Sequence, residues 1–336
     1  MPEAGFYEPE DGTGVIRTPQ SGRAAAAAAL VAVACGGAPD RAWTATAGFV
    51  RYGEDRGRIE YADREAVAKK KLFRRINADR AAHGAPPVEY DLLAAKVGDD
   101  FCLDAVKGKF VGHWDLAGRP PYLRWALAGG VDFHGQNVGS ISRKGWDVIQ
   151  SEIAALLLES HERMMEERPP DDGHRRAILD PKWTHVGIGV AWGWGEFRMT
   201  EEFVRRVAEW VEVPARPVAA GSGAPFRAKL PSGWSAGVIE VAFEGAPAPM
   251  TREEIFRRDQ YGLPPAFQTL LPALPPQVRY EGGGTGEFPV SGGRIEARIP
   301  LSKGPGSYYV LLFAEKGSPS PGQKLTPVVA ARIEAR

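Results

Sequence analysis

The spacing of apolar residues changes along this chain, and that change limits the folds open to it. Before residue 168, apolar side chains recur at helical intervals over residues 64–82, 92–106 and 146–167. Beyond residue 225, short apolar runs separated by glycine and proline resemble strands, at residues 237–243, 293–299, 307–313 and 325–333. The pattern predicts a helix-rich domain followed by a smaller all-β domain, an immunoglobulin-like sandwich.

The helix-rich half also contains a predicted β-hairpin. Val186, Ile188 and Val190 alternate with small residues over 185–192, and a Gly-Trp-Gly turn leads into a returning strand over 196–204. A further short strand is predicted at 136–140. Helices combined with an antiparallel hairpin place the first domain in the α+β class.

The length and the loop composition divide the chain into segments. A chain of 336 residues is long enough for about two domains. Residues 214–225 are rich in Pro, Gly and Ala, and residues 36–63 are weakly patterned, with room for one short strand. We therefore predict a leader at 1–35, a linker at 36–63, a first domain at 64–213, a linker at 214–225 and a β-sandwich domain at 226–336.

The leader resembles an export signal. An apolar run at 24–34 follows Arg17 and Arg23 and is too short to span a bilayer, which needs about 20 apolar residues. Cys35 then stands where a bacterial lipoprotein carries its lipidated cysteine, although Ala32 replaces the usual leucine. A lipoprotein, a plainly secreted protein and a disordered alanine-rich leader stay open as readings. The first two predict an extracellular or cell-envelope location.

Charge and cysteine content exclude several classes of protein. The 42 basic and 42 acidic residues cancel, so nothing global draws the chain to nucleic acid or to an anionic membrane. The only membrane contact that we predict is a lipid anchor at Cys35. Two cysteines, Cys35 and Cys102, cannot build a disulfide framework or a four-thiolate metal site, and Cys102 lies on an apolar helix face as a core residue. The sequence contains no serine-nucleophile elbow, HExxH motif or phosphate-binding loop.

All six histidines lie between residues 83 and 185, within or near four short motifs. These motifs are INADRAAHGAPP at 76–87, GHWDLAGRPPYLR at 112–124, GQNV at 135–138, and SHERMM at 160–165 followed by GHRRAILDP at 173–181 and VGIGV at 186–190. Their order and content resemble the CAP superfamily (cysteine-rich secretory proteins, antigen 5 and pathogenesis-related proteins, also called the SCP domain), in its bacterial type. The resemblance implies an α-β-α sandwich with a cleft that holds two histidines and two glutamates.

Carried onto this chain, the resemblance names the cleft residues. The histidines are His113 and His174. Gln136 stands at the first glutamate position, and Glu167 is our choice for the second, with Glu166 and Glu162 as alternatives. Some family members bind a divalent metal in the cleft, so His113 and His174 are the candidate ligands of an ion such as zinc.

The glutamine at position 136 weakens the case for catalysis. Replacing Glu by Gln removes a charge and a general base. We therefore expect weak metal binding, and the favoured function is an exported envelope protein that binds a lipid, peptide or glycan in a histidine-containing cleft. The alternatives are a metal-dependent hydrolase using both histidines and a nearby Glu, and a purely structural envelope component. Of the other residues, we expect His161 to pack or cap its helix and Asn137 to satisfy backbone groups.

Overall fold

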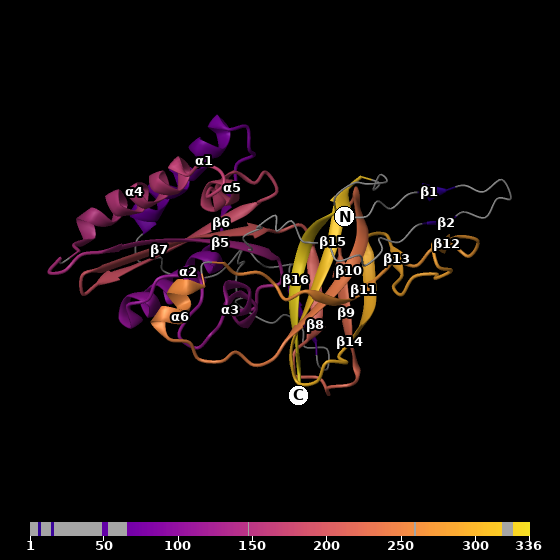
Figure 1. Cartoon of the computed structure of the whole chain (residues 1–336). Helices are drawn as coiled ribbons and strands as arrows, with labels where there is room; N and C mark the ends of the chain where they lie inside the picture. Colours follow the sequence, from indigo (N-terminus) through magenta and orange to yellow (C-terminus); the bar gives the residue numbers. More distant parts are fainter. Residues whose placement is uncertain are drawn as a thin grey trace.

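The computed structural model describes residues 6–7, 15–16, 49–52, 66–146, 148–258, 260–317 and 325–336. Cys35, the rest of the predicted leader apart from two short strands, and most of the linker at 36–63 lie outside the described residues. The chain forms two parts, which we call the mixed part (residues 66–205) and the sandwich part (residues 210–336) (Figure 1).

A four-stranded sheet forms the centre of the mixed part. Its strands are β4 (Glu89–Tyr90), β6 (His185–Gly193), β7 (Glu196–Arg205) and β5 (Phe133–Ser142), in that order, so β5 lies at an edge. Strands β5, β6 and β7 are antiparallel, and Gln136 lies opposite Glu202 while Asn137 lies opposite Glu201. Successive side chains of a strand point to opposite faces, so Gln136 and Asn137 serve different layers.

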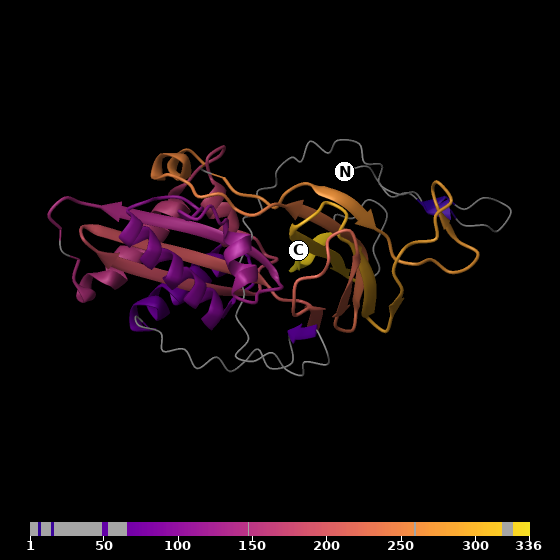
Figure 2. The same ribbon diagram turned by 90° about the horizontal axis from the view of Figure 1, so that it is seen from below.

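Helices cover both faces of this sheet (Figures 1 and 2). Helices α1 (Ala66–Ala82), α4 (Ile153–Glu166) and α5 (Gly173–Leu179) lie on one face, and α2 (Leu92–Gly108) and α3 (Pro121–Leu127) lie on the other. Helix α2 begins at Asp91, whose carboxylate accepts from the backbone N–H groups of Leu93 and Ala94, as its sequence predicts. The three layers are the α-β-α arrangement expected from the resemblance.

The sequence predicted most of these elements but extended one helix too far. Helices α1 and α2 and strands β6 and β7 are confirmed. The helix predicted over 146–167 begins only at Ile153, after a 3₁₀ turn, η1 (Gln150–Glu152), and α3 was predicted as loop. Cys102 is fully buried, as expected for a core residue.

Two packed sheets form the sandwich part. One contains β11 (Ala266–Leu270), β10 (Trp234–Glu244), β15 (Gly306–Lys316) and β16 (Thr326–Ala335), and the other contains β13 (Val290–Ser291), β14 (Arg294–Pro300), β9 (Gly223–Lys229), β8 (Trp210–Pro214) and β3 (Phe49–Tyr52). Their inner faces share one hydrophobic core. Three further short strands, β1 (Phe6–Tyr7), β2 (Val15–Ile16) and β12 (Arg279–Tyr280), pair beside it.

The strand order matches the immunoglobulin-like sandwich that the sequence predicted. Taken from β8 onward, the sheets read D-E-B-A and C′-C-F-G, which is the arrangement of that fold. Near the start of the F-equivalent strand, the Tyr308 hydroxyl accepts from the Lys303 N–H (2.6 Å) and donates to the Gly304 carbonyl (2.9 Å), as in the tyrosine corner of such domains. Strand β8 pairs with β9, so residues 215–222, within the segment predicted as a linker, connect two strands of one sheet.

The two parts touch directly and through a long excursion of the chain. Arg205 donates to the Pro327 carbonyl (3.0 Å), and the Ala330 N–H donates to the Val131 carbonyl (2.8 Å). Between β10 and β11, residues 245–265, which we call the strap, leave the sandwich, form α6 (Arg252–Arg257) and run along the mixed part before returning (Figure 1). No helix in the part of the chain that the structure describes is long and apolar enough to cross a membrane.

Candidate functional site

His113 and Gln136 meet on the α2–α3 side of the sheet. His113 lies in the loop after α2, and Gln136 is buried on edge strand β5. The Gln136 amide nitrogen donates to Glu202 Oε1 (2.9 Å), which leaves the amide oxygen facing His113 Nδ1 at 3.0 Å. An amide oxygen can only accept, so Nδ1 carries the proton and Nε2 keeps its lone pair.

The imidazole of His113 is neutral at physiological pH. Burial lowers its pKa to about 3, against the opposing effect of the hydrogen bond to Gln136, and the positive charges of His174 and Arg124 lower it further. Its Nε2 has no hydrogen-bond partner in the described structure, and the side chain is only half-buried, so solvent reaches this nitrogen. His113 therefore presents a hydrogen-bond acceptor to solvent.

His174 is held by Glu167 at the start of α5. Its Nδ1 lies 2.5 Å from Glu167 Oε1, and its backbone N–H donates to Glu167 Oε2 (3.0 Å). Burial alone would raise the pKa of Glu167, but the hydrogen bond and charge of His174, with the backbone N–H groups of Arg175 and His174, outweigh it, so that the pKa lies below its usual value. The carboxylate fixes a proton on His174 Nδ1, and Nε2 has no hydrogen-bond partner in the described structure.

Of the three glutamates that the sequence offered, only Glu167 contacts a cleft histidine. Glu162 is exposed and pairs with Arg75 at 2.7 Å, and Glu166 is exposed at the end of α4. The structure therefore brings together His113 with Gln136, and His174 with Glu167.

The two pairs lie on opposite faces of edge strand β5. Gln136 holds His113 from one face, and from the other face the next residue, Asn137, donates to the His174 carbonyl (3.2 Å) and to Glu201 Oε2 (3.0 Å). They are close enough for the charge of His174 to lower the pKa of His113. Asn137 satisfies a backbone carbonyl, as the sequence suggested, but the carbonyl belongs to the cleft histidine 37 residues away.

The donor set offers two nitrogen ligands and falls short of a catalytic zinc centre. Such a centre takes about three protein ligands and a water. His113 and His174 each offer one Nε2, while the Gln136 oxygen and the Glu167 carboxylate are engaged by the Nδ1 atoms. Among the residues that the structure describes, no group of three or more His, Cys, Asp or Glu side chains is placed to hold a metal ion. We derive no metal-dependent step.

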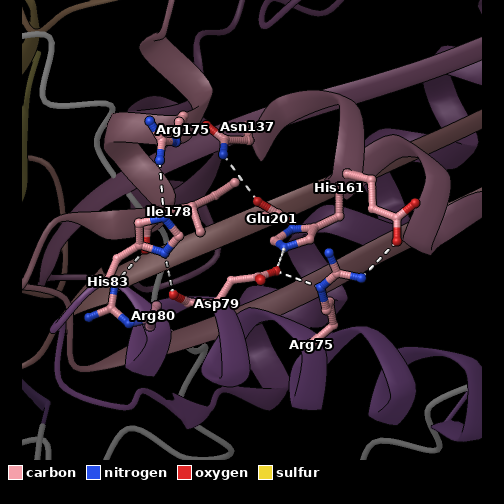
Figure 3. Close-up of polar contacts among 10 residues, drawn as sticks. Arg75, Asp79, Arg80, His83, Asn137, His161, Arg175, Ile178 and Glu201 are labelled. Carbon is pink, nitrogen blue, oxygen red and sulfur yellow. Dashed lines mark hydrogen bonds and ion pairs between the residues drawn. The ribbon is translucent and has the colours of Figure 1, made fainter. Parts of the chain in front are cut away.

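Sequence reasoning missed a buried network behind the cleft, drawn in Figure 3. His161 is fully buried, with Nδ1 2.6 Å from Glu201 Oε1 and Nε2 3.0 Å from Asp79 Oδ2. Burial lowers the pKa of His161, but the two carboxylates outweigh burial and raise it above its usual value. His161 is thus packed in its helix, as predicted, and it also joins α1, α4 and β7 by charge.

The opposite face of the sheet carries a second histidine–carboxylate pair. His134 Nε2 lies 3.0 Å from Glu202 Oε2, and both side chains are fully buried. Burial raises the pKa of Glu202 to about 7, although hydrogen bonds and the Arg124 charge oppose it, and burial lowers the pKa of His134 well below its usual value. Two adjacent glutamates in a strand covered on both faces are the sequence signal that could have revealed both pairs.

Tyr261, from the strap, is the other residue that sequence reasoning missed. It is buried, and its ring lies against the His113 ring with a centroid distance of 4.5 Å. Its hydrogen-bond partner, Gln136, lies 125 residues earlier in the chain, so no local pattern in the sequence points to this contact.

Part of this chain is similar to known proteins. Residues 73–200 match the family model described as CAP, the cysteine-rich secretory protein family. Among solved structures, the chain is similar to an extracellular protein containing an SCP domain from Bacillus anthracis (19% identity, TM-score 0.32, 42% of this chain and 41% of that one). It is also similar to an outer surface protein from Borrelia burgdorferi (14% identity, TM-score 0.34, 44% of this chain and 99% of that one). The chain thus spans about two fifths of the length of the Bacillus protein, and no curated protein matches it.

Proposed function

We propose that this chain, which carries a CAP domain at residues 73–200, is an exported cell-envelope protein whose cleft binds a hydroxyl-bearing ligand, a glycan. The observation that carries the proposal is the shared geometry of the two cleft histidines. Each imidazole contacts the protein through Nδ1, and neither Nε2 atom has a hydrogen-bond partner in the described structure, so both can contact a ligand; that of His113 is an acceptor.

The acceptor character of the site favours a glycan over the other two ligand classes. Sugar hydroxyls donate hydrogen bonds at many positions, whereas a lipid chain offers no donor. A peptide offers N–H donors, but in an extended chain they alternate with carbonyl acceptors, which the lone pair of His113 Nε2 cannot satisfy. The neutral state of His113 supports this reading because an imidazolium would present a donor instead.

Hydrolysis has less support from the same residues. Gln136 is neutral, and the Glu202 carboxylate behind it is enclosed between Gln136 and His134. Glu167 is occupied by His174. Neither Glu167 nor Glu202 is free to serve as a general base, so binding is the function that this arrangement favours.

Titration of the imidazole nitrogens by NMR tests the proposal. We expect a soluble N-acetylglucosamine tetramer to shift the Nε2 resonances of His113 and His174 saturably, and His113→Ala or His174→Ala to abolish binding. His185→Ala, outside the cleft, is the matched control and should bind normally. A short-chain phosphatidylcholine, a tripeptide and Zn²⁺ are the competing probes. Saturable binding of one of these without the tetramer would overturn the glycan assignment.

Export is tested separately. If Cys35 is a lipid anchor, the wild-type protein fractionates with membranes and Cys35→Ser releases it. Secretion of a soluble wild type would exclude the anchor but keep the export proposal, and retention in the cytoplasm would overturn both.

A further inference from the structure

The strap is far longer than its connection requires. Strands β10 and β11 are antiparallel neighbours, and such strands are ordinarily joined by about two to five residues. The chain instead spends residues 245–265 on an excursion over the mixed part (Figure 2). An ordered excursion of this length costs conformational entropy, so its contacts must offset that cost.

The strap is docked on the loop that carries His113. Ile255 is fully buried with Phe101, Ala105 and Phe110 of the mixed part. The Met250 N–H donates to the Leu116 carbonyl (3.0 Å).

The backbone of this loop packs closely against the backbone of the strap. At Gly118, which has a φ of 73°, an added Cβ would lie 1.9 Å from the Ala248 carbonyl oxygen. Glycine is therefore required there both for its backbone conformation and for the approach of the strap. The strap and the His113 loop form one packed unit.

Beyond α6, the strap brings Tyr261 to the edge of the sheet. The Tyr261 hydroxyl accepts from the Gln136 N–H (2.5 Å) and donates to the Gln136 carbonyl (3.1 Å). An edge strand leaves such backbone groups unpaired, so the phenol takes the place of a neighbouring strand at this residue. The ring of Tyr261 lies at a 53° tilt against the imidazole of His113.

We propose that Tyr261 is a positioning residue of the cleft, through which the sandwich part holds the Gln136 main chain and the His113 ring in their ligand-binding geometry. The inference rests on the proposed function for its ligand. Gln136 fixes the proton on His113 Nδ1, and Tyr261 fixes Gln136, so the orientation of the acceptor Nε2 depends on a residue from the second domain.

The variant Tyr261→Phe tests this because it removes the hydroxyl and keeps the ring packing. We expect amide exchange at Gln136 to accelerate at least tenfold, the pKa of His113 to rise as water enters, and the dissociation constant of the N-acetylglucosamine tetramer to rise roughly fivefold, the effect of one net hydrogen bond. The first two readouts need no ligand.

Tyr308→Phe is a matched control within the sandwich part. Its hydroxyl also accepts from one backbone N–H and donates to one backbone carbonyl, but it lies in the sandwich core. The Tyr308→Phe variant should accelerate amide exchange at Lys303 and leave both the amide exchange of Gln136 and the pKa of His113 unchanged.

The outcomes separate this inference from the proposed function. Unchanged Gln136 exchange and His113 titration in Tyr261→Phe would overturn the role of Tyr261, even if the wild type binds the tetramer. The same changes appearing in Tyr308→Phe would overturn it too, because they would report general loosening. If the wild type binds no tetramer but exchange and titration change as expected, the positioning role stands and the glycan assignment falls.

Discussion

The two faces of the central sheet carry the same pair of residue types in opposite states. On the α1–α4 face, His161 lies against Glu201, and on the α2–α3 face, His134 lies against Glu202. All four side chains are fully buried, and the two glutamates are neighbours on β7. Yet the pKa of His161 is raised, whereas the pKa of His134 is lowered and that of Glu202 rises to about 7.

The difference comes from a second carboxylate. Burial opposes charge on both faces, because it removes water from the ionised groups. His161 is held between two acidic groups, Glu201 and Asp79, and their combined attraction exceeds the penalty. His134 has only Glu202, and its Nδ1 is buried without a hydrogen-bond partner in the described structure. One histidine–glutamate contact is thus insufficient to sustain charge inside this protein, and two carboxylates are enough.

Removing His161 should have the largest effect. His161→Leu would leave Glu201 and Asp79 without their shared cation, and the loss of one partner of a buried ion pair costs about 3–5 kcal/mol. Urea unfolding at pH 6 measures it. Because the folded pKa of His161 is raised, its stabilisation is full below the unfolded pKa and is lost as pH rises through the folded pKa, so the difference from wild type should shrink at high pH.

His83→Leu serves as the control for that experiment, because His83 is exposed at the end of α1. A cost below about 1 kcal/mol for His161→Leu would show that His161 is not charged in the folded protein.

Gln136→Glu should have the next largest effect. It places a carboxyl group against Glu202, where the amide nitrogen now donates at 2.9 Å, and two adjacent buried carboxyls cannot both ionise. We expect a loss of about 2–4 kcal/mol at pH 8 that is mostly recovered at pH 5, measured by chemical denaturation. Equal losses at both pH values would indicate that packing, and not charge, is disturbed.

Glu202→Gln tests whether the buried carboxyl group of Glu202, on the α2–α3 face, is protonated in the folded protein. The folded pKa of about 7 exceeds the unfolded value of 4.5, so the folded protein holds an extra proton between these values and loses stability as pH rises through them. The loss is on the order of 2–3 kcal/mol, and the variant should lack it. Unfolding free energies at pH 5, 6 and 7.5 measure the slope, and an identical slope in the variant would contradict the assignment.

Asp79→Asn should have the smallest effect on stability and sharpens the comparison most directly. It leaves His161 with one carboxylate, like His134, so the pKa of His161 should fall by one unit or more, with a loss of about 1 kcal/mol. Imidazole NMR titration measures it. Glu162→Gln alters an exposed carboxylate on α4, the helix that carries His161, and it should leave the pKa of His161 unchanged.

Local patterns were enough to predict the frame of the molecule and the nearest neighbours in the cleft. The cap at Asp91 and the alternation of Val186, Ile188 and Val190 act within a few residues, so α2 and β6 could be predicted. The start of α4 could not be predicted. The apolar spacing ahead of it resembles that of a helix, but the structure has the 3₁₀ turn η1 there and α4 begins only at Ile153.

The contacts that complete the site depend on distant segments of the chain. His161 gains its charge from Asp79 and Glu201, which lie on another helix and on a strand. Tyr261 reaches Gln136 from a different domain. Residue spacing carries no signal for such pairings, and the motif resemblance covers only the mixed part, so the strap could not be predicted from it.

The burial of Ile255 has a practical consequence for anyone who dissects this protein. A fragment ending near residue 213 would contain both histidines of the site, but it would lack Tyr261 and expose the apolar surface formed by Phe101, Ala105 and Phe110. Such a fragment should self-associate through that bare surface, because apolar area left in water favours aggregation. Residues 245–265 therefore have to stay with the mixed part, and the order of domains along the sequence is a poor guide to where the chain can be cut.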